Sequence, residues 1–351
     1  MKIAILGAGL MGRTLSFRLY QEGYNNLTLF DQDDINGKIS SAYVAAGMLS
    51  PYFESVMGGI NIYNLGKKSL TLWQQYLSLL DLKHLYNDYG TILLATHGFS
   101  NDMDHYIKKI SANVDKTDYY YKLDQFELIK IEQQLKFNYA YFIPDEACIN
   151  ARQVLKGLGD YLYNKIKWQH NIKVSYSSST QNILVNDQLK GFDFVIDCRG
   201  LGSRDLQPNL RGVRGEIIRV YASEVALKHP IRLFYPRQNI YITPYSKHDY
   251  IIGATEIEAE DFSPISIKSA LELLNLACVV HPGFNEARIL EMNTNCRPTL
   301  NNNLPQIKAY DNFISINGLY RHGFLIAPTL AETIINYLNT GIKQYPEIWS
   351  E

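Results

Sequence analysis

The sequence predicts a mixed α/β (α+β) fold in which two domains are interleaved along the chain, and three observations support this prediction. The first thirty residues read as strand, glycine turn, helix and strand, which is typical of the start of a parallel sheet. Short apolar runs separated by polar turns between residues 214 and 255 indicate neighbouring antiparallel strands. A strand, a second glycine-rich turn and a helix between residues 313 and 338 return the chain to the first sheet.

The opening unit has the motif of a dinucleotide-binding turn. The apolar run 2–6 is followed by GAGLMG at 7–12, by a helix predicted over 13–22 and by a strand at 27–30 that ends at Asp31. Gly7 permits the tight turn, Gly9 lets a pyrophosphate approach the backbone, and Gly12 lets helix and strand pack closely. The helix N-terminus favours the pyrophosphate, and Asp31 is placed to bind a ribose hydroxyl. We therefore predict a Rossmann-like domain; a purely structural glycine turn is the alternative.

The remaining elements are predicted from apolar periodicity, from turn residues and from a possible helix cap at Asn150. A segment of small residues at 40–51 lets the backbone run close to a flat ligand, or forms a tight packing turn. The elements expected after it are a helix at 61–80, strands at 89–95 and 137–143, a helix at 151–165, strands at 172–174, 192–197, 214–220, 240–244 and 250–255, a helix at 266–280, a strand at 313–317 and a closing helix at 324–338.

Length and composition exclude several classes of protein. The 351 residues suggest about two domains, and the net charge of −1 gives no reason to expect nucleic acid or an anionic membrane as a partner. The four cysteines are scattered without a C-x-x-C pair, which argues against a zinc site and a disulfide framework. No apolar run reaches the length of a transmembrane helix, and the N-terminus does not resemble a signal peptide. We expect a cytoplasmic protein without a metal site.

Eight stretches, in order along the chain, resemble the flavoenzymes of the D-amino-acid oxidase (DAO) superfamily, and most of all the glycine oxidases of thiamine biosynthesis. They are GAGLMG at 7–12, AAGML at 45–49, DCRGLGSRDL at 197–206, VRGE at 213–216, YITP at 241–244, GATEIE at 253–258, CRPTLNNNLPQI at 296–307 and GLYRHGFLIAPTLAE at 318–332. The resemblance implies noncovalently held FAD rather than NAD. It also implies an FAD-binding domain at 1–82, 138–205 and 305–351, and a substrate domain at 83–137 and 206–304 built on a mostly antiparallel sheet.

The resemblance also places the FAD contacts on particular residues. These are grouped at the first glycine turn, at the end of the second strand, in the small-residue segment, beside the adenosine, at the second glycine turn, and under the flavin. The predicted contacts are Gly7, Gly9, Leu10, Met11, Gly12, Asp31, Gln32, Ser41, Ala46, Gly47, Met48, Val174, Gly200, Leu319, Tyr320, Arg321, His322, Gly323, Phe324 and Leu325.

Three residues are candidates for binding substrate. An arginine suits a substrate carboxylate because its planar fork binds both oxygens and keeps its charge. The resemblance places Arg297, Arg321 and Tyr241 at the substrate; the alternatives are surface ion pairs for the arginines and core packing for the tyrosine. A closing helix that begins near Gly323 would direct free N–H groups at the flavin, where negative charge develops.

Two further positions leave questions open. We propose no general base, because the substrate amine can lose its proton to water; His322 is therefore expected to be structural, with an acid/base role as the alternative. Glu256 stands where some glycine oxidases have an apolar side chain, and Cys198 and Arg199 stand where many relatives have small residues. The preferred amine or amino acid is not fixed by the sequence.

The resemblance predicts oxidative deamination of glycine or a similar small amine. Hydride would pass from the α carbon to flavin N5, giving an imine and then an oxo acid (glyoxylate from glycine), ammonia and, with O₂, H₂O₂. The expected partners are a small amino-acid substrate, O₂, enzymes of thiazole synthesis, and further copies of the chain in a homo-oligomer. The alternatives are a D-amino-acid or sarcosine-type dehydrogenase with another electron acceptor, a flavin protein without catalysis, and an NAD(P)-dependent dehydrogenase.

Overall fold

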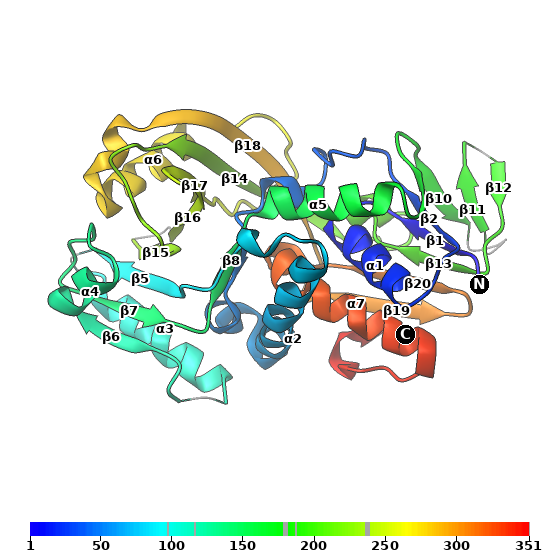
Figure 1. Ribbon diagram of the computed structural model, residues 1–351, viewed down its shortest axis with the longest axis horizontal. Helices are drawn as coiled ribbons and strands as arrows, with labels where there is room; N and C mark the ends of the chain where they lie inside the picture. Colours follow the sequence, from blue (N-terminus) through cyan, green and yellow to red (C-terminus); the bar gives the residue numbers. More distant parts are fainter. Residues whose placement is uncertain (97, 116, 178–181, 187, 236–238, 351) are drawn as a thin grey trace.

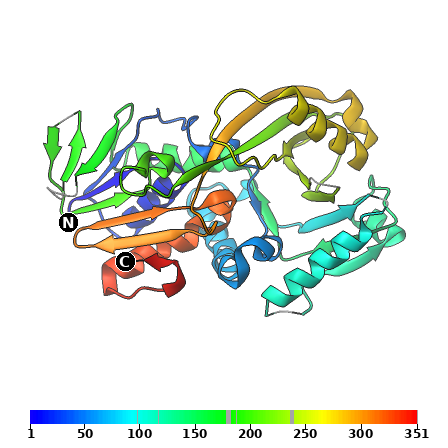
Figure 2. The same cartoon turned by 180° about the vertical axis from the view of Figure 1, so that it is seen from behind.

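Two large sheets lie at opposite ends of an elongated molecule (Figure 1). The computed structural model describes residues 1–96, 98–115, 117–177, 182–186, 188–235 and 239–350. Figure 2 shows from behind that both chain termini lie beside the first of these sheets. The predicted mixed α/β fold is confirmed.

The first sheet has seven strands in the order β21-β19-β20-β13-β1-β2-β9. β1 pairs in parallel with β2 and β13, whereas β19 is antiparallel to β20. Continuous apolar runs suit such a sheet because both of its faces are covered. The strands are β1 Ile3–Leu6, β2 Leu27–Phe30, β9 Lys167–Gln169, β13 Phe194–Asp197, β19 Gln306–Tyr310, β20 Phe313–Asn317 and β21 Trp349–Ser350.

Helices cover one face of this sheet, and a small antiparallel sheet covers the other. The helices are α1 Leu10–Gln21, α5 Ala151–Tyr163 and α7 Gly323–Thr340, and α2 Pro51–Leu79 packs against α7. The small sheet contains β10 Val174–Ser177, β11 Asn182–Val185 and β12 Gln188–Lys190.

The second large sheet has eight strands in the order β18-β14-β17-β16-β15-β5-β7-β6, antiparallel except for the pair β15 and β5. Its strands are β5 Thr91–Ala95, β6 Tyr121–Asp124, β7 Tyr139–Ile143, β14 Arg211–Tyr221, β15 Ile231–Phe234, β16 Ile240–Ser246, β17 Asp249–Gly253 and β18 Arg288–Thr299. α4 Gln125–Ile131 and α6 Ile267–Val280 pack on one face, and α3 Ser100–Asn113 packs on the other.

Short elements connect the two halves. A three-stranded sheet joins β3 Met48–Leu49, β8 Ala147–Ile149 and β4 Tyr86–Asn87. The 3₁₀ helices are η1 Ser41–Val44, η2 Lys83–Leu85, η3 Gly200–Ser203, η4 Pro282–Glu286, η5 Tyr320–His322 and η6 Pro346–Ile348.

The pleat of the eight-stranded sheet determines which side chains face the first sheet. Because side chains alternate between faces along a strand, Ile231 and Leu233 pack toward α6 and the residue between them points the other way. The strand register places Arg232, Tyr241, Gly253 and Ile217 opposite one another in one row across four strands. This row forms part of the wall of the cavity described below.

Two expectations about the elements need correction. The helix predicted over 61–80 begins at Pro51 and has a non-helical backbone at Gly59, with φ of +65°, so small residues obscure the apolar stripe of its first half. Residues 139–143, predicted to belong to the first domain, form β7 of the eight-stranded sheet. The remaining division into domains stays a prediction.

Within the described residues, no helix has the length and apolarity needed to cross a membrane, and no group of acidic, histidine or cysteine side chains is arranged to hold a metal ion.

Candidate active site

A cavity of about 920 Å³ extends from the carboxyl ends of the parallel strands to the inner face of the eight-stranded sheet. Its lining includes residues that follow β1, β2 and β13, and residues of β14, β16 and β18. In open α/β sheets, ligands bind outside the carboxyl ends of the strands. The location therefore agrees with the Rossmann-like reading of the opening motif.

The end of the cavity nearest the parallel strands is formed by the first glycine turn. Gly7 has a φ of +94°, and a Cβ placed on Gly12 would lie 1.8 Å from the Gly7 carbonyl oxygen. Gly9 is the N-cap of α1 and supplies no side-chain cap, so the N–H groups of the first helical turn are available to a ligand. Asp31 accepts hydrogen bonds from the N–H groups of Ala8 and Asp33, which fixes its carboxylate beside this turn.

The small-residue segment forms another wall of the cavity. The described lining includes Ser41, Ala46, Gly47 and Met48. Gly47 has a φ of +77°, and a Cβ there would lie 2.0 Å from the carbonyl oxygen of Ile149. A side chain at Gly47 would therefore displace the backbone, so the sequence is restricted here by close packing as well as by backbone conformation.

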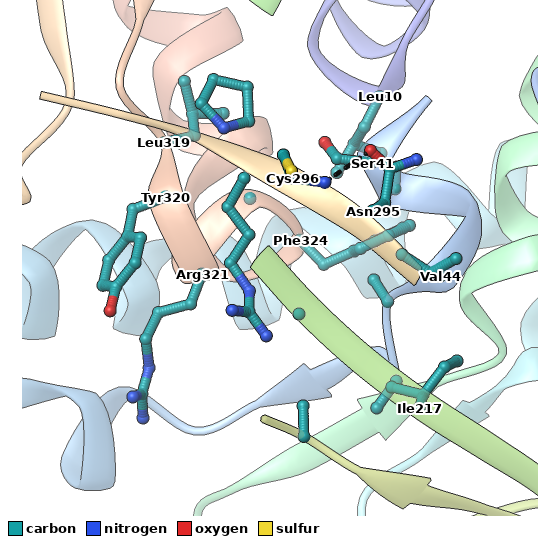
Figure 3. Close-up of a pocket in the computed structure, with 18 of the residues that line it drawn as sticks. Leu10, Ser41, Val44, Ile217, Asn295, Cys296, Leu319, Tyr320, Arg321 and Phe324 are labelled. Atoms are coloured by element: carbon teal, nitrogen blue, oxygen red, sulfur yellow. Dashed lines mark hydrogen bonds between the residues drawn. The ribbon is translucent and has the colours of Figure 1, made fainter. Parts of the chain in front are cut away.

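The turn before the closing helix contributes the third wall (Figure 3). β20 ends at Asn317, η5 follows, and α7 begins at Gly323 with no side-chain cap from His322. Figure 3 shows Tyr320 and Arg321 projecting from neighbouring positions of this turn, with Leu319 and Phe324 nearby. The lining residues predicted from this region are Leu319, Tyr320, Arg321, Gly323, Phe324 and Leu325.

Arg297 lies on β18, in the part of the cavity beside the eight-stranded sheet. Its Nη1 and Nη2 donate to the backbone carbonyls of Arg214 and Thr255, at 3.3 and 3.2 Å. A Cβ placed on Gly215 would lie 2.3 Å from Nη2, so this glycine makes room for the guanidinium. Among the described side chains, no carboxylate lies within ion-pairing distance of Arg297. Backbone carbonyls thus position Arg297 and leave its charge without an anionic partner in that set.

Arg321 has a different environment. Its Nε and Nη2 donate to the two oxygens of Glu54 at 2.8 and 3.0 Å, and its Nη1 donates to Glu256 at 2.9 Å. Glu54 also pairs with Nη2 of Arg232 at 3.1 Å, and its Oε2 lies 3.2 Å from Nδ1 of His322. Burial alone would raise the pKa of Glu54, but the charges of Arg321 and Arg232 and the nearby His322 hold that pKa well below its usual range.

Tyr241 lies on β16, on the face of the eight-stranded sheet that lines the cavity. A Cβ placed on Gly253 would lie 2.8 Å from both the Tyr241 hydroxyl and Cγ2 of Ile217, so this glycine makes room for the tyrosine ring. Burial raises the pKa of Tyr241, and the positive charges of Arg297, Arg232 and Arg321 offset only part of that effect. The hydroxyl is therefore neutral near pH 7 and can donate a hydrogen bond to an anion in the cavity.

Most of the predicted site residues line this cavity, including Arg297, Arg321, Tyr241, Gln32, Leu10, Met11 and Gly200. Gly12, Val174 and His322 are not among the lining residues. Gly12 packs against Gly7, and His322 is buried between Glu54 and the ring of Tyr320. The carbonyl of Val174 accepts a hydrogen bond from Arg199, which itself lines the cavity and pairs with Asp197.

Sequence reasoning missed Glu54 and Arg232. Both are buried and lie in otherwise apolar surroundings, Glu54 after Tyr52 and Phe53, and Arg232 between Ile231 and Leu233. A lone charge in an apolar helix or strand could have identified them, because a buried charge needs a partner. The partner itself could not be named from the sequence, since Glu54 and Arg321 are 267 positions apart.

Comparison with known proteins gives matches over almost the full chain. The family model of the DAO family, described as FAD dependent oxidoreductase, matches residues 2–337. A protein of Rhizobium etli whose assigned name is thiamine biosynthesis oxidoreductase ThiO is 33% identical over 342 residues, which cover 97% of each chain.

Two more distant matches extend the comparison. The bifunctional protein ThiO/ThiG of Nostoc sp. is 22% identical over 348 residues, and the match spans 96% of this chain but only 52% of that longer protein. The crystal structure of glycine oxidase from Geobacillus kaustophilus superposes with a TM-score of 0.82 at 20% identity, covering 96% of this chain and 94% of the other. At that identity the superposition demonstrates a shared fold.

Proposed function

The chain belongs to the DAO family of FAD-dependent oxidoreductases, and from this premise we propose that it catalyses the oxidative deamination of glycine or a similar small amine or amino acid. The observation that carries the proposal is the position of Arg297, whose guanidinium faces the cavity with no carboxylate partner among the described residues. A cation of that kind is suited to a substrate carboxylate.

The residues of the cavity fit FAD. The N-termini of α1 and α7 both reach the lining and neither has a side-chain cap, so N–H groups are available at two points. The first suits a pyrophosphate, and Asp31 beside it suits a ribose hydroxyl. Gly7, Gly9 and Gly47 line the cavity without a side chain, so a flat ligand could lie directly against the backbone at these positions. Bound here, FAD would supply the acceptor for the hydride that leaves the α carbon.

The chain's own residues would bind and orient the substrate. Arg297 would hold both carboxylate oxygens, and the neutral hydroxyl of Tyr241 would donate to the same group. The first turn of α7 would stabilise negative charge that develops in front of it. Because the position of a bound substrate is set by these contacts, its α carbon would be presented in a fixed orientation.

A protein base is not part of the proposal. His322 is buried beside Glu54 and away from the lining, and Glu54 itself is held by Arg321 and Arg232. The substrate amine would lose its proton to water before the hydride leaves. The resulting imine would hydrolyse to the oxo acid, glyoxylate from glycine, and to ammonia, and O₂ would be reduced to H₂O₂.

We also propose that the product serves the formation of the thiazole of thiamine. Two observations support this role: the name of the Rhizobium etli relative refers to thiamine biosynthesis, and the Nostoc relative carries a ThiG portion in the same polypeptide as its ThiO portion. An enzyme of thiazole synthesis is therefore the expected protein partner, beside further copies of this chain.

The test is oxygen consumption by the FAD-loaded protein when glycine is added, with H₂O₂ and ammonia measured in the same sample. We expect one H₂O₂ and one ammonia for each O₂ consumed. Turnover of glycine, sarcosine or a D-amino acid that requires an added quinone would instead support the dehydrogenase alternative. Absence of turnover with all of these amines and both acceptors would contradict the proposal.

A further inference from the structure

We propose that Glu256 restricts the substrate pocket to amines that carry one carboxylate. Glu256 occupies Arg321, the arginine to which a second substrate carboxylate would otherwise bind. The inference rests on the proposed function and specifies its substrate class. Glu256 lines the cavity together with Arg297, Arg321 and Tyr241, and its side chain is 40% exposed. It is the residue directly after Thr255, whose carbonyl positions Arg297.

Carboxylates already occupy three of the five N–H groups of Arg321. A guanidinium has five N–H groups and binds a carboxylate best along an edge that offers two of them. Glu54 occupies the edge formed by Nε and Nη2, and Glu256 occupies Nη1. A second carboxylate at Arg321 would meet two carboxylates already in place. Glu256 would have to leave, because Glu54 is buried and is also bound by Arg232.

Tyr320 holds Glu256 in this position. One oxygen of Glu256 accepts a hydrogen bond from the Tyr320 hydroxyl while the other accepts from Arg321. The two donors belong to neighbouring residues of η5, so the carboxylate is bound at two points of one turn. Glu256 is attached to the chain and already held by two donors. Keeping it at Arg321 therefore costs less entropy than binding a free substrate carboxylate in its place.

The charges of the described pocket residues support the same conclusion. Arg232 and Arg321 are paired with Glu54, and Arg321 is paired again with Glu256. Arg297 is the arginine of this group that has no carboxylate partner within the described set. One unpaired cation matches one substrate carboxylate. A dicarboxylate would add a negative charge beside Glu54 and Glu256, where like charges oppose binding.

Removal of this charge should change the choice between one and two carboxylates. Glu256→Gln keeps the size of the side chain and an acceptor for Tyr320, but removes the charge that occupies Arg321. Methoxyacetate and diglycolate are suitable probes because they are unreactive ether analogues of sarcosine and iminodiacetate. Their dissociation constants for the FAD-loaded protein can be measured by calorimetry or by the change in flavin absorbance.

We expect the wild type to bind diglycolate at least tenfold more weakly than methoxyacetate. In Glu256→Gln the ratio of the two constants should shift toward diglycolate by about tenfold or more. Glu258→Gln is the matched control, because Glu258 is 64% exposed, pairs with Arg211 and does not line the cavity. The control should keep the wild-type ratio. Glu256→Met provides a second uncharged variant if the first does not fold.

A ratio that stays within twofold of the wild-type value in both Glu256 variants would overturn the inference. So would wild-type protein that binds diglycolate as tightly as methoxyacetate. Turnover of sarcosine and iminodiacetate is measured in parallel. Turnover of glycine and D-amino acids is measured as well, with O₂ and with a quinone. If the probes bind as expected but none of these amines is oxidised with either acceptor, the proposed function fails while the role of Glu256 stands.

Discussion

The two ends of the cavity are built in different ways. Glycine turns and small residues form much of the end beside the parallel strands, including the continuous stretch Gly7–Met11. The end beside the eight-stranded sheet consists of charged and aromatic side chains from α2, β15, β16, β18 and η5. Close packing of the backbone determines the shape of the first end. A network of ion pairs determines where the side chains of the second end lie.

The two ends should therefore respond to different substitutions. An added methyl group should disrupt the packing of the first end and weaken FAD binding there, because a carbonyl already fills the space beside a glycine. Loss of a charge should destabilise the second end, because each buried charged group there is paired with a group of opposite charge.

Gly12→Ala should give the largest effect. The new Cβ would lie 1.8 Å from the Gly7 carbonyl, so helix α1 and the glycine turn must separate. We expect a loss of about 3 kcal/mol of stability and at least a tenfold loss of bound FAD, measured from thermal unfolding and from the ratio of flavin to protein absorbance. Gly191→Ala is the control, since its Cβ would meet the Asn182 side chain at an ordinary 3.5 Å. Normal FAD content in Gly12→Ala would refute the packing argument.

Glu54→Gln should destabilise the protein by about 3 kcal/mol, because it leaves two arginines beside a buried neutral group. The pKa of Glu54 is lowered in the folded state, so its stabilisation is present above its ordinary pKa of 4.5 and is lost as the pH falls through the lower folded pKa. Urea unfolding should therefore show a difference from wild type that is largest near pH 7 and smaller below pH 4.5.

The matched control for this prediction is Glu286→Gln. Glu286 is 74% exposed and lies 3.9 Å from Arg288, so its loss should change the free energy of unfolding by less than about 0.5 kcal/mol. A Glu54→Gln variant as stable as this control at pH 7 would contradict the role given to the ion-pair network.

Arg297→Ala should lower kcat/KM for the amine substrate by about a hundredfold, because both charged hydrogen bonds to the carboxylate are lost. FAD content and unfolding should stay close to wild type, since Arg297 bonds only to backbone carbonyls among the described residues. Arg288→Ala on the same strand is the control, with a side chain that is 75% exposed. Equal steady-state kinetics in the two variants would remove Arg297 from the substrate site.

Tyr241→Phe should give the smallest effect of this series. It removes one hydroxyl from the carboxylate site and keeps the ring that packs against Gly253. A neutral hydrogen bond contributes about 1 kcal/mol, so kcat/KM should fall about fivefold with unchanged FAD content. Tyr163→Phe, at an exposed position on α5, should leave the kinetics unchanged. A loss as large as that of Arg297→Ala would mean that Tyr241 has a further role.

The same contrast explains how much the sequence could predict. The glycine turn, its flanking strands and Asp31 follow one another in the chain, so local spacing identified them. Arg297 and Arg321 were found through resemblance, but their different partners were not, because Glu54 and Glu256 approach Arg321 from 267 and 65 positions away. The start of α2 was missed because glycines and serine interrupt its apolar pattern. Only the folded chain shows that Gly215 and Gly253 make room for Arg297 and Tyr241.

The most direct test of the proposed chemistry is the visible spectrum of the FAD-loaded protein, recorded without oxygen before and after glycine is added. We predict a flavin spectrum that bleaches on addition of glycine and returns when air is admitted. A spectrum that stays oxidised with glycine, sarcosine and D-amino acids alike would contradict the proposal that this cavity oxidises small amino acids.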